Sequence, residues 1–536
     1  MQASSLQKRR VTGAHAFFLG AFLALLALTP AILPYGGRFV TRGDFIEQQL
    51  PFILETRRIL RSGLNSYSFN TFLGAPAVGS YAFYTLGSVF VWPLALLPKA
   101  LIPFGISVMA VLKHAVCALT SFCYLRRMVK EERLALLGSV LYTFSAFTIV
   151  NTQFYHFLEV IAFFPLILLG MEDAMSDHPR RGLLALFCGL NTLTNYYFML
   201  SSALLAALYF VFRFFSADWK PRRTFKNVFM LIFECGAGCA LAGVLLVPSM
   251  LFMLSITRTG AGDTSVLMQH YSASTLLERL RALIMPIESN VVHAYYGDAP
   301  SWASTAAYLP LFGLTGAVSA FAQKKSRWLR GLLLALAVCC VVPVLCGAFA
   351  LETNISYTRW WYGLALMLTL VTLTALEDFD AHTWRTSFLI LTALTALLTV
   401  PFLLPEWLAK PHGARRRRAA QPPEGRLRRL FSASFSSAPR CSAAARCSLC
   451  SSESCASPSH WRSRAPLPSR NTRATSPSAT RTCFPAAKRP AMACIRSPKS
   501  PNRRFKPSKR RIWISGSAST TAKKSAITGF CAGQAV

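Results

Sequence analysis

Long apolar runs constrain this chain more than any other feature of its sequence. The first, residues 16–33, follows Lys8, Arg9 and Arg10 and predicts a membrane-spanning helix, because about 20 apolar residues cross a bilayer as a helix. It is longer than the apolar core of a signal peptide, and no clear small-residue cleavage site follows it. Further candidate spans lie near residues 104–125, 134–151, 158–171, 183–197, 198–214, 227–254, 302–322, 331–350, 361–376 and 387–405. The runs therefore predict an all-α polytopic membrane protein with about eleven transmembrane helices.

The basic residues between the runs predict its orientation. If residues 1–13 lie in the cytoplasm, the inner connections hold most of the Lys and Arg, as the positive-inside rule expects, at 126–133, 180–181, 213–226, 324–330 and Arg385. This alternation requires that residues 81–97, which Pro93 interrupts, re-enter the membrane or lie at its outer interface. The transmembrane domain then covers residues 14–405, with a large first outer loop at 36–103 and a second at 255–301.

A basic tail at residues 406–536 has a different composition. Residues 413–536 hold 26 Lys and Arg against 2 Asp and Glu, whereas residues 1–412 hold 31 against 20, so most of the net charge of +35 lies in the tail. The tail is rich in Arg, Ser, Ala, Pro and Cys and has no helical or strand period. Such a segment buries too little apolar surface to fold, and we expect it to be disordered.

Three interpretations of this tail are open. Cys447 and Cys450 have the spacing of half a zinc site, but no second pair follows at finger spacing. A basic arm could bind nucleic acid or anionic lipid, yet the topology places the tail outside, so we expect no nucleic-acid partner. Out-of-frame translation of GC-rich DNA also produces this composition, and we adopt it as the hypothesis. It fails if the other two frames beyond codon 412 encode no further hydrophobic spans.

The cysteines before the tail lie in apolar runs and read as small buried hydrophobic residues, without disulfides. Cys235 and Cys239 share a helix face that holds no His or carboxylate partner, so packing is the better explanation than a metal site. The sequence contains no Walker loop, dinucleotide fingerprint or zinc-protease motif.

The segment after the first span holds a concentration of polar groups. Ile46, Leu50, Ile53 and Leu54 have the spacing of an amphipathic helix lying on the membrane, which Pro51 must kink or restart. Asp44, Glu47 and Gln48 would then share its water-facing side. They are either the solvated face of that helix or a site for a catalytic base or metal ion.

The same segment resembles the opening of the YfhO family of bacterial membrane proteins, through Gly43, Asp44, Gln49, Pro51 and Phe52. Further matches follow in order along residues 14–405: Asn70 to Gly74, Tyr81, His156 with Glu159, Phe164 to Leu166, Asn195 to Phe198, Pro248 before Ser255 and Arg258, Tyr295 to Gly297, and Arg359. Members usually continue with more spans and an outer region, which this chain lacks. That departure agrees with truncation or a frameshift after about residue 412, and it puts the activity of this product in doubt.

The resemblance implies a function. The YfhO family is similar to the C-type glycosyltransferase (GT-C) superfamily, whose members move a sugar from a polyprenyl-phosphate carrier to an acceptor outside the membrane. It therefore implies a GT-C-like fold in the bacterial cell membrane, with a cell-envelope polymer or glycolipid as acceptor. By the same resemblance the catalytic acidic residue of the first outer loop is Asp44, which suits a general base or the ligand of a divalent cation. No cofactor is otherwise expected.

Other residues are candidates for the same site. Glu47 and Glu159 are further catalytic candidates, although Glu159 could instead cap and orient its helix. Arg258 and Arg359 could contact the lipid phosphate, or anchor their helices at the interface. The remaining candidates for substrate binding are His156, Asn195, Tyr196 and Gln49.

A transporter or lipid flippase explains the number of helices equally well. Such a protein is expected to show internal repeats or paired broken helices, and no convincing repeat is present. A cavity at the membrane midplane around Glu234 would favour transport, whereas an outer loop packed over Asp44 would favour sugar transfer.

Overall fold

The computed structural model describes residues 10–41, 43–63, 67–71, 74–255, 270–286, 303–310, 312–350 and 355–403. The described chain is almost entirely helical, and its one strand pair joins β1 (Tyr67–Ser68) to β2 (Ala75–Pro76) in antiparallel register. The longer helices are α1 (Gly13–Ile32), α2 (Leu50–Arg61), α5 (Ile102–Met128), α6 (Glu132–Thr143), α8 (Phe157–Ala174), α9 (Leu183–Thr194), α10 (Tyr196–Phe214), α11 (Phe225–Leu241), α12 (Gly243–Ser255), α13 (Ala273–Ile284), α14 (Gly313–Ala322), α15 (Arg327–Val341), α17 (Trp361–Glu377) and α18 (Ala381–Leu403). Short helices are α3 (Ala77–Tyr81), α4 (Trp92–Leu96), α7 (Ala146–Val150) and α16 (Pro343–Ala348), with π-helical turns at Phe45–Gln49 and Ala82–Leu86.

Within these ranges, four helical stretches are long and apolar enough to cross a membrane. They are Gly13–Tyr35, Lys99–Met128, Glu132–Gln153 and Tyr196–Phe214. A fifth results if α11 and α12, which meet at an angle of 74°, form one broken span. Leu183–Thr194, Gly313–Ala322 and Trp361–Glu377 are apolar but shorter. The chain is thus a helical protein with membrane-spanning character, and the count of eleven spans stays a prediction.

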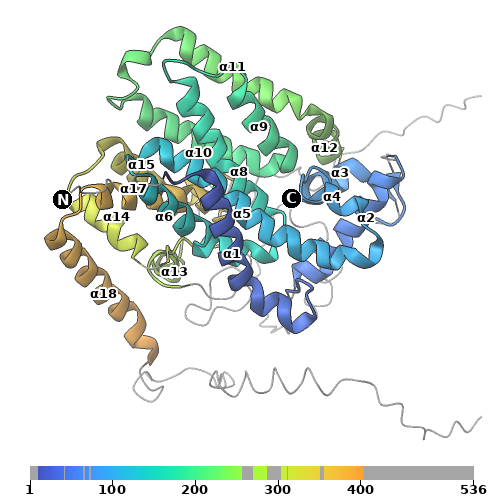
Figure 1. Ribbon diagram of the computed structural model, residues 1–536, viewed down its shortest axis with the longest axis horizontal. Coiled ribbons are helices and arrows are strands. Elements are labelled where there is room, and N and C mark those ends of the chain that lie inside the picture. The colour runs from blue at the N-terminus through green and yellow to red at the C-terminus, as the bar shows by residue number, and fades with distance from the viewer. Residues whose placement is uncertain are drawn as a thin grey trace, which may run out of the picture. The chain divides into compact units, whose positions relative to one another are not determined.

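Two of the apolar helices, α8 and α17, are enclosed by other helices. α1 lies along α5, which also packs against α6 and α8, while α9 packs against α8 and α11 (Figure 1). Both helices are largely apolar and are buried over most of their length, and the buried acids of α8, Glu159 and Glu172, are paired with Lys113 and Arg213. A helix without a polar face is stable only when other helices or lipid surround it, which explains this central placement.

Small residues allow α9 and α11 to approach closely. A Cβ atom on Gly238 would lie 2.4 Å from the carbonyl oxygen of Ala185 and 2.9 Å from the amide nitrogen of Gly189. Helices in membranes associate through such close backbone packing because lipid supplies no hydrophobic driving force between them.

The segment after α1 differs from the amphipathic surface helix predicted for it. A π-helical turn at Phe45–Gln49 continues directly into α2, and Pro51 lies in the first turn of α2. Gln48, predicted to face water, is buried, whereas Ile46 is 44% exposed. The predicted faces were wrong for Gln48 and Ile46, because a π-turn has more residues per turn than an α-helix and rotates its side chains relative to those of α2. The apolar face, represented by the fully buried Ile53, packs against protein rather than lying on lipid.

Residues 77–96 form a chain of short helices instead of one crossing helix. α3, the π-turn Ala82–Leu86 and α4 follow one another, and every side chain of the π-turn is buried. Gly87 comes so close to the end of α9 that a Cβ atom there would lie 1.8 Å from the carbonyl oxygen of Leu193. This broken segment therefore packs into the helical domain, and it carries part of the candidate site.

Candidate functional site

His156 and Gln49 join two segments that are far apart in the sequence. His156 directly precedes α8, and its Nδ1 lies 2.9 Å from Oε1 of Gln49 in the π-turn before α2. Both side chains are buried. Because the amide oxygen only accepts, Nδ1 of His156 carries the proton in this hydrogen bond. Nε2 of His156 is buried and has no hydrogen-bond partner among the described residues.

Arg359 lies beside this pair, in the turn that precedes α17. Its side chain is only 9% exposed, and its guanidinium carbon lies 4.2 Å from the ring centre of Tyr357 and 5.4 Å from that of Phe157. These are cation–π contacts, and Nε of Arg359 is buried without a hydrogen-bond partner among the described residues. A buried cation is costly when no carboxylate is paired with it, and no described carboxylate forms an ion pair with Arg359, so this group is suited to hold an anionic ligand.

Asp44 supplies a carboxyl group on which the charge of this guanidinium acts. It is the residue before the π-turn and is half-buried, while Glu47 in the same turn is exposed. Burial raises the pKa of the Asp44 carboxyl, the charge of Glu47 raises it further, and the charge of Arg359 lowers it. Asp44 and Arg359 are therefore within electrostatic range of each other, although they come from opposite ends of the domain sequence.

Glu159 forms a buried ion pair that the sequence did not predict. Its Oε1 lies 2.7 Å from Nζ of Lys113 on α5 and accepts a hydrogen bond of 2.5 Å from the hydroxyl of Ser88. Lys113 also donates to the carbonyl oxygen of Tyr155 at 2.8 Å and lies 3.4 Å from the centre of the Tyr155 ring. The available signal was a lysine inside an apolar helix of 27 residues, since such a charge requires a partner.

Asn195 and Tyr196 bring the junction of α9 and α10 to the same place. Oδ1 of Asn195 accepts from the amide of Phe198 and caps α10, while its Nδ2 donates to the carbonyl oxygen of Phe83 at 3.0 Å. The ring of Phe83 lies 5.1 Å from that of His156 and 6.4 Å from that of Tyr196. The Tyr196 hydroxyl is buried and has no hydrogen-bond partner within the described ranges.

The structure thus gathers most of the predicted site residues around His156. Asp44, Gln49, His156 and Arg359 form its centre, Glu159 lies one helical turn farther along α8, and Asn195 and Tyr196 adjoin it through Phe83. Glu47 adjoins Asp44 on the exposed side. Arg258 lies outside the described residues, so its predicted role in phosphate binding stays a prediction. Sequence reasoning missed Lys113, Ser88 and Phe83.

The described residues contain no group of three or more His, Cys, Asp or Glu side chains that could hold a metal ion. Asp44 and Glu47 are two carboxylates within electrostatic range of each other, and they could hold a Mg²⁺ ion only together with ligands from a substrate or water. The cysteines of the described chain are all free, and Cys117, Cys188, Cys339 and Cys346 are buried.

Comparison with known proteins gives one match. The family model described as "Bacterial membrane protein YfhO" matches residues 16–409. No curated protein and no solved structure matches the chain. The matched range includes every predicted site residue and ends just before the change to the basic composition at residue 413.

Proposed function

The chain belongs to the YfhO family of bacterial membrane proteins, and from that premise we propose that it is a membrane glycosyltransferase. It would take a sugar from a polyprenyl-phosphate carrier and attach it to a cell-envelope polymer or glycolipid on the extracytoplasmic side. The observation that supports this most is Arg359, a nearly buried guanidinium without an acidic hydrogen-bond partner in the described chain, close to the half-buried Asp44. A cationic group for phosphate and a carboxyl for an acceptor hydroxyl are what the reaction needs.

In the proposed reaction, Asp44 accepts the proton of the acceptor hydroxyl as that oxygen forms its bond to the anomeric carbon. The bond from the anomeric carbon to the phosphate oxygen breaks, and the polyprenyl phosphate leaves with the electron pair. Arg359 stabilises the charge that develops on this leaving group, because a guanidinium donates two parallel hydrogen bonds to phosphate oxygens. The raised pKa of Asp44 brings it closer to the operating pH, which favours general-base catalysis.

The remaining residues have positioning roles in this proposal. The hydrogen bond from His156 to Gln49 fixes the π-turn, and hence Asp44, against the start of α8. Glu159 is fully buried and paired with Lys113, so we assign it to holding α8, α5 and Ser88 together rather than to contact with substrate. Asn195 and Tyr196 hold residues 77–96 near the site.

A divalent cation fits the proposal only if the substrate supplies ligands. Asp44 and Glu47 offer carboxylate oxygens, and Mg²⁺ in phosphate chemistry is held by one or two carboxylates together with substrate phosphate and water. Transfer that persists in excess chelator would show that Asp44 acts as a base instead.

The test is transfer from a labelled polyprenyl-phosphate sugar in membranes that contain the protein. Asp44→Asn keeps the side-chain volume and removes the base, and we expect the rate to fall by roughly 10²-fold or more. Arg359→Gln should reduce transfer at low donor concentration most strongly. Glu131→Gln, an exposed acid at the start of α6, is the control and should leave transfer unchanged. Unchanged transfer by Asp44→Asn would remove Asp44 as the base.

A transporter or lipid flippase is the second candidate, and the bend between α11 and α12 favours it, because transporters place binding sites at broken helices. Glu234 on α11 is buried, lies 4.0 Å from Arg181, and has one oxygen without a partner in the described chain. Movement of a labelled lipid across vesicles that depends on Glu234 but not on Asp44 would favour this function.

A further inference from the structure

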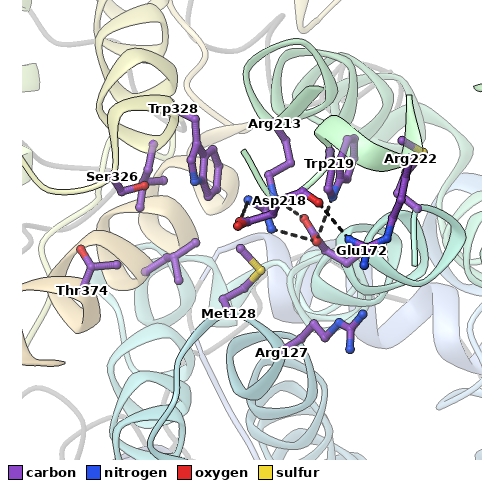
Figure 2. A pocket seen from close by; sticks show the side chains of 13 residues that line it. Arg127, Met128, Glu172, Arg213, Asp218, Trp219, Arg222, Ser326, Trp328 and Thr374 are labelled. Carbon is purple, nitrogen blue, oxygen red and sulfur yellow. Dashed lines mark hydrogen bonds and ion pairs between the residues drawn. The ribbon is translucent and has the colours of Figure 1, made fainter. Parts of the chain in front are cut away.

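Arg359 differs from another buried arginine of the domain in how its side chain is held. The guanidinium of Arg213 pairs with Glu172 and with Asp218, so acidic side chains fix its direction (Figure 2). Within the described ranges no carboxylate forms an ion pair with Arg359, which lies over aromatic rings instead. The direction of the Arg359 side chain therefore depends on the turn that carries it, residues 355–360.

A mostly buried, non-helical segment, residues 303–310, packs against this turn and precedes α14. The amide of Ala307 donates to the carbonyl oxygen of Ala282 on α13 at 3.0 Å. The carbonyl oxygen of Tyr308 accepts a hydrogen bond of 2.8 Å from the amide of Ala146 at the start of α7. Backbone outside a helix is tolerated within a membrane domain only where protein or water surrounds it. Residues 303–310 are thus a fixed internal support for the turn.

Thr358, the residue directly before Arg359, joins the turn to this segment. Its amide and its hydroxyl both donate to the carbonyl oxygen of Ala303, each at 2.9 Å. The Thr358 hydroxyl also lies 3.0 Å from the hydroxyl of Thr305. The Thr358 side chain is 0% exposed, so water does not compete for these hydrogen bonds. Two donors on one carbonyl oxygen fix both the backbone and the side chain of Thr358.

Ser304 holds the segment from its other side. Its φ angle of 59° is uncommon for a serine, and such conformations persist where the surrounding structure holds them. The Ser304 hydroxyl donates to Oδ1 of Asn151 at 2.7 Å, and both residues are fully buried. Nδ2 of Asn151 donates to the carbonyl oxygen of Phe147 on α7, which sets the direction of the Asn151 amide. A continuous chain of hydrogen bonds therefore runs from α7 to the residue before Arg359.

We propose that Thr358 and Ser304 are positioning residues for the donor phosphate, because they fix the turn from which Arg359 extends. This inference rests on the role of Arg359 in the proposed function. Two parallel hydrogen bonds from a guanidinium to phosphate require a defined direction, which no acidic partner supplies at this site. A displacement of about 1 Å at a group that positions a substrate can cost a large factor in rate. Neither Thr358 nor Ser304 contacts the substrate in this proposal.

The experiment uses the full chain in membranes and a panel of labelled polyprenyl-phosphate hexoses, of which the one transferred fastest by the unaltered chain is the probe. Thr358→Val keeps the side-chain shape and removes the hydroxyl, and Thr358→Ser restores it. Ser304→Gly removes the second hydroxyl and keeps the positive φ angle without strain. The control is Thr369→Val on α17, a buried threonine whose hydroxyl bonds only to the carbonyl oxygen of Ala365 in its own helix. The KM for the donor and the melting temperature are measured for each variant.

We expect Thr358→Val to raise the donor KM roughly tenfold, Ser304→Gly to raise it less, and Thr358→Ser and Thr369→Val to leave it unchanged. A double variant separates positioning from a general loss of stability. If Thr358 acts through Arg359, Thr358→Val should add nothing to the effect of Arg359→Gln, whereas a purely structural role would add its own effect.

Two results would overturn the inference while the proposed function stands. One is that Arg359→Gln raises the donor KM but Thr358→Val and Ser304→Gly do not. The other is that the effects of Thr358→Val and Arg359→Gln add in the double variant. If Arg359→Gln alone leaves the donor KM unchanged, or if the unaltered chain transfers none of the hexoses, the proposed function itself is contradicted and the inference falls with it.

Discussion

Replacing Lys113 by Met should reveal how strongly the buried ion pair holds the candidate site together. The Lys113 and Glu159 side chains are 0% and 1% exposed, and their charged atoms lie 2.7 Å apart. Lys113→Met leaves the Glu159 carboxylate buried without its counter-ion, and breaking such a pair costs about 3–5 kcal/mol. The hydroxyl of Ser88 still donates to Glu159 Oε1, so we expect a cost near the lower end of that range.

The double variant Lys113→Met with Glu159→Gln removes both charges and separates charge pairing from packing. Neutral replacements of a buried pair are often close to neutral for stability, so the double variant should be more stable than Lys113→Met by about 2 kcal/mol. The assay is reversible unfolding in mixed detergent micelles, with helical signal followed as denaturing detergent increases. The control is Arg126→Met on the same helix, which removes a partly exposed pair with Glu132 and should cost less than about 1 kcal/mol.

Two results would refute this reasoning. If Lys113→Met unfolds like the unaltered chain, the buried charge has found solvent or another partner, and the pair does not organise the site. If the double variant is as unstable as Lys113→Met, the cost comes from lost packing around Tyr155 and not from an unpaired carboxylate.

The remaining predictions concern pH and backbone packing. Transfer activity should rise with pH as the Asp44 carboxyl, whose pKa is raised, loses its proton. Because the charge of Glu47 raises this pKa, Glu47→Gln should move the rise in activity to lower pH. A pH–rate profile that is the same in Glu47→Gln and the unaltered chain would contradict the prediction. Hydrogen bonds from Arg58 lower the pKa of Glu55 to about 2 from the ordinary value of 4.5. The Glu55 carboxylate therefore stabilises the folded chain fully above pH 4.5, and this stabilisation is lost as the pH falls toward 2. The difference in stability between the unaltered chain and Glu55→Gln should therefore shrink in acid titrations over that window. Gly87→Ala should lower the melting temperature, because its Cβ would collide with the carbonyl oxygen of Leu193. Gly236→Ala is the control, since a Cβ there would meet no atom within 4 Å. Equal melting temperatures of the two variants would exclude the close contact at Gly87.

The sequence by itself determined the class of the protein and most of the helix positions. Apolar runs are local properties, and the predicted spans at 16–33, 104–125 and 198–214 correspond to α1, α5 and α10. The order of weak motifs was enough to indicate the family that the match over residues 16–409 shows. The predicted run at 227–254 is also mostly apolar, yet it forms two helices that meet at an angle of 74°.

Tertiary structure decided which polar groups meet. Hydropathy is a property of single residues and does not indicate which distant segments of the chain pack together. The pairing of Lys113 with Glu159, and the proximity of Asp44 to Arg359, therefore became known only from the packing of the helices. The burial of Gln48 depends on a π-turn, which a period of 3.6 residues cannot anticipate. The sequence supplied the charged groups, and packing selected their partners because a buried charge is tolerated only beside a compensating group.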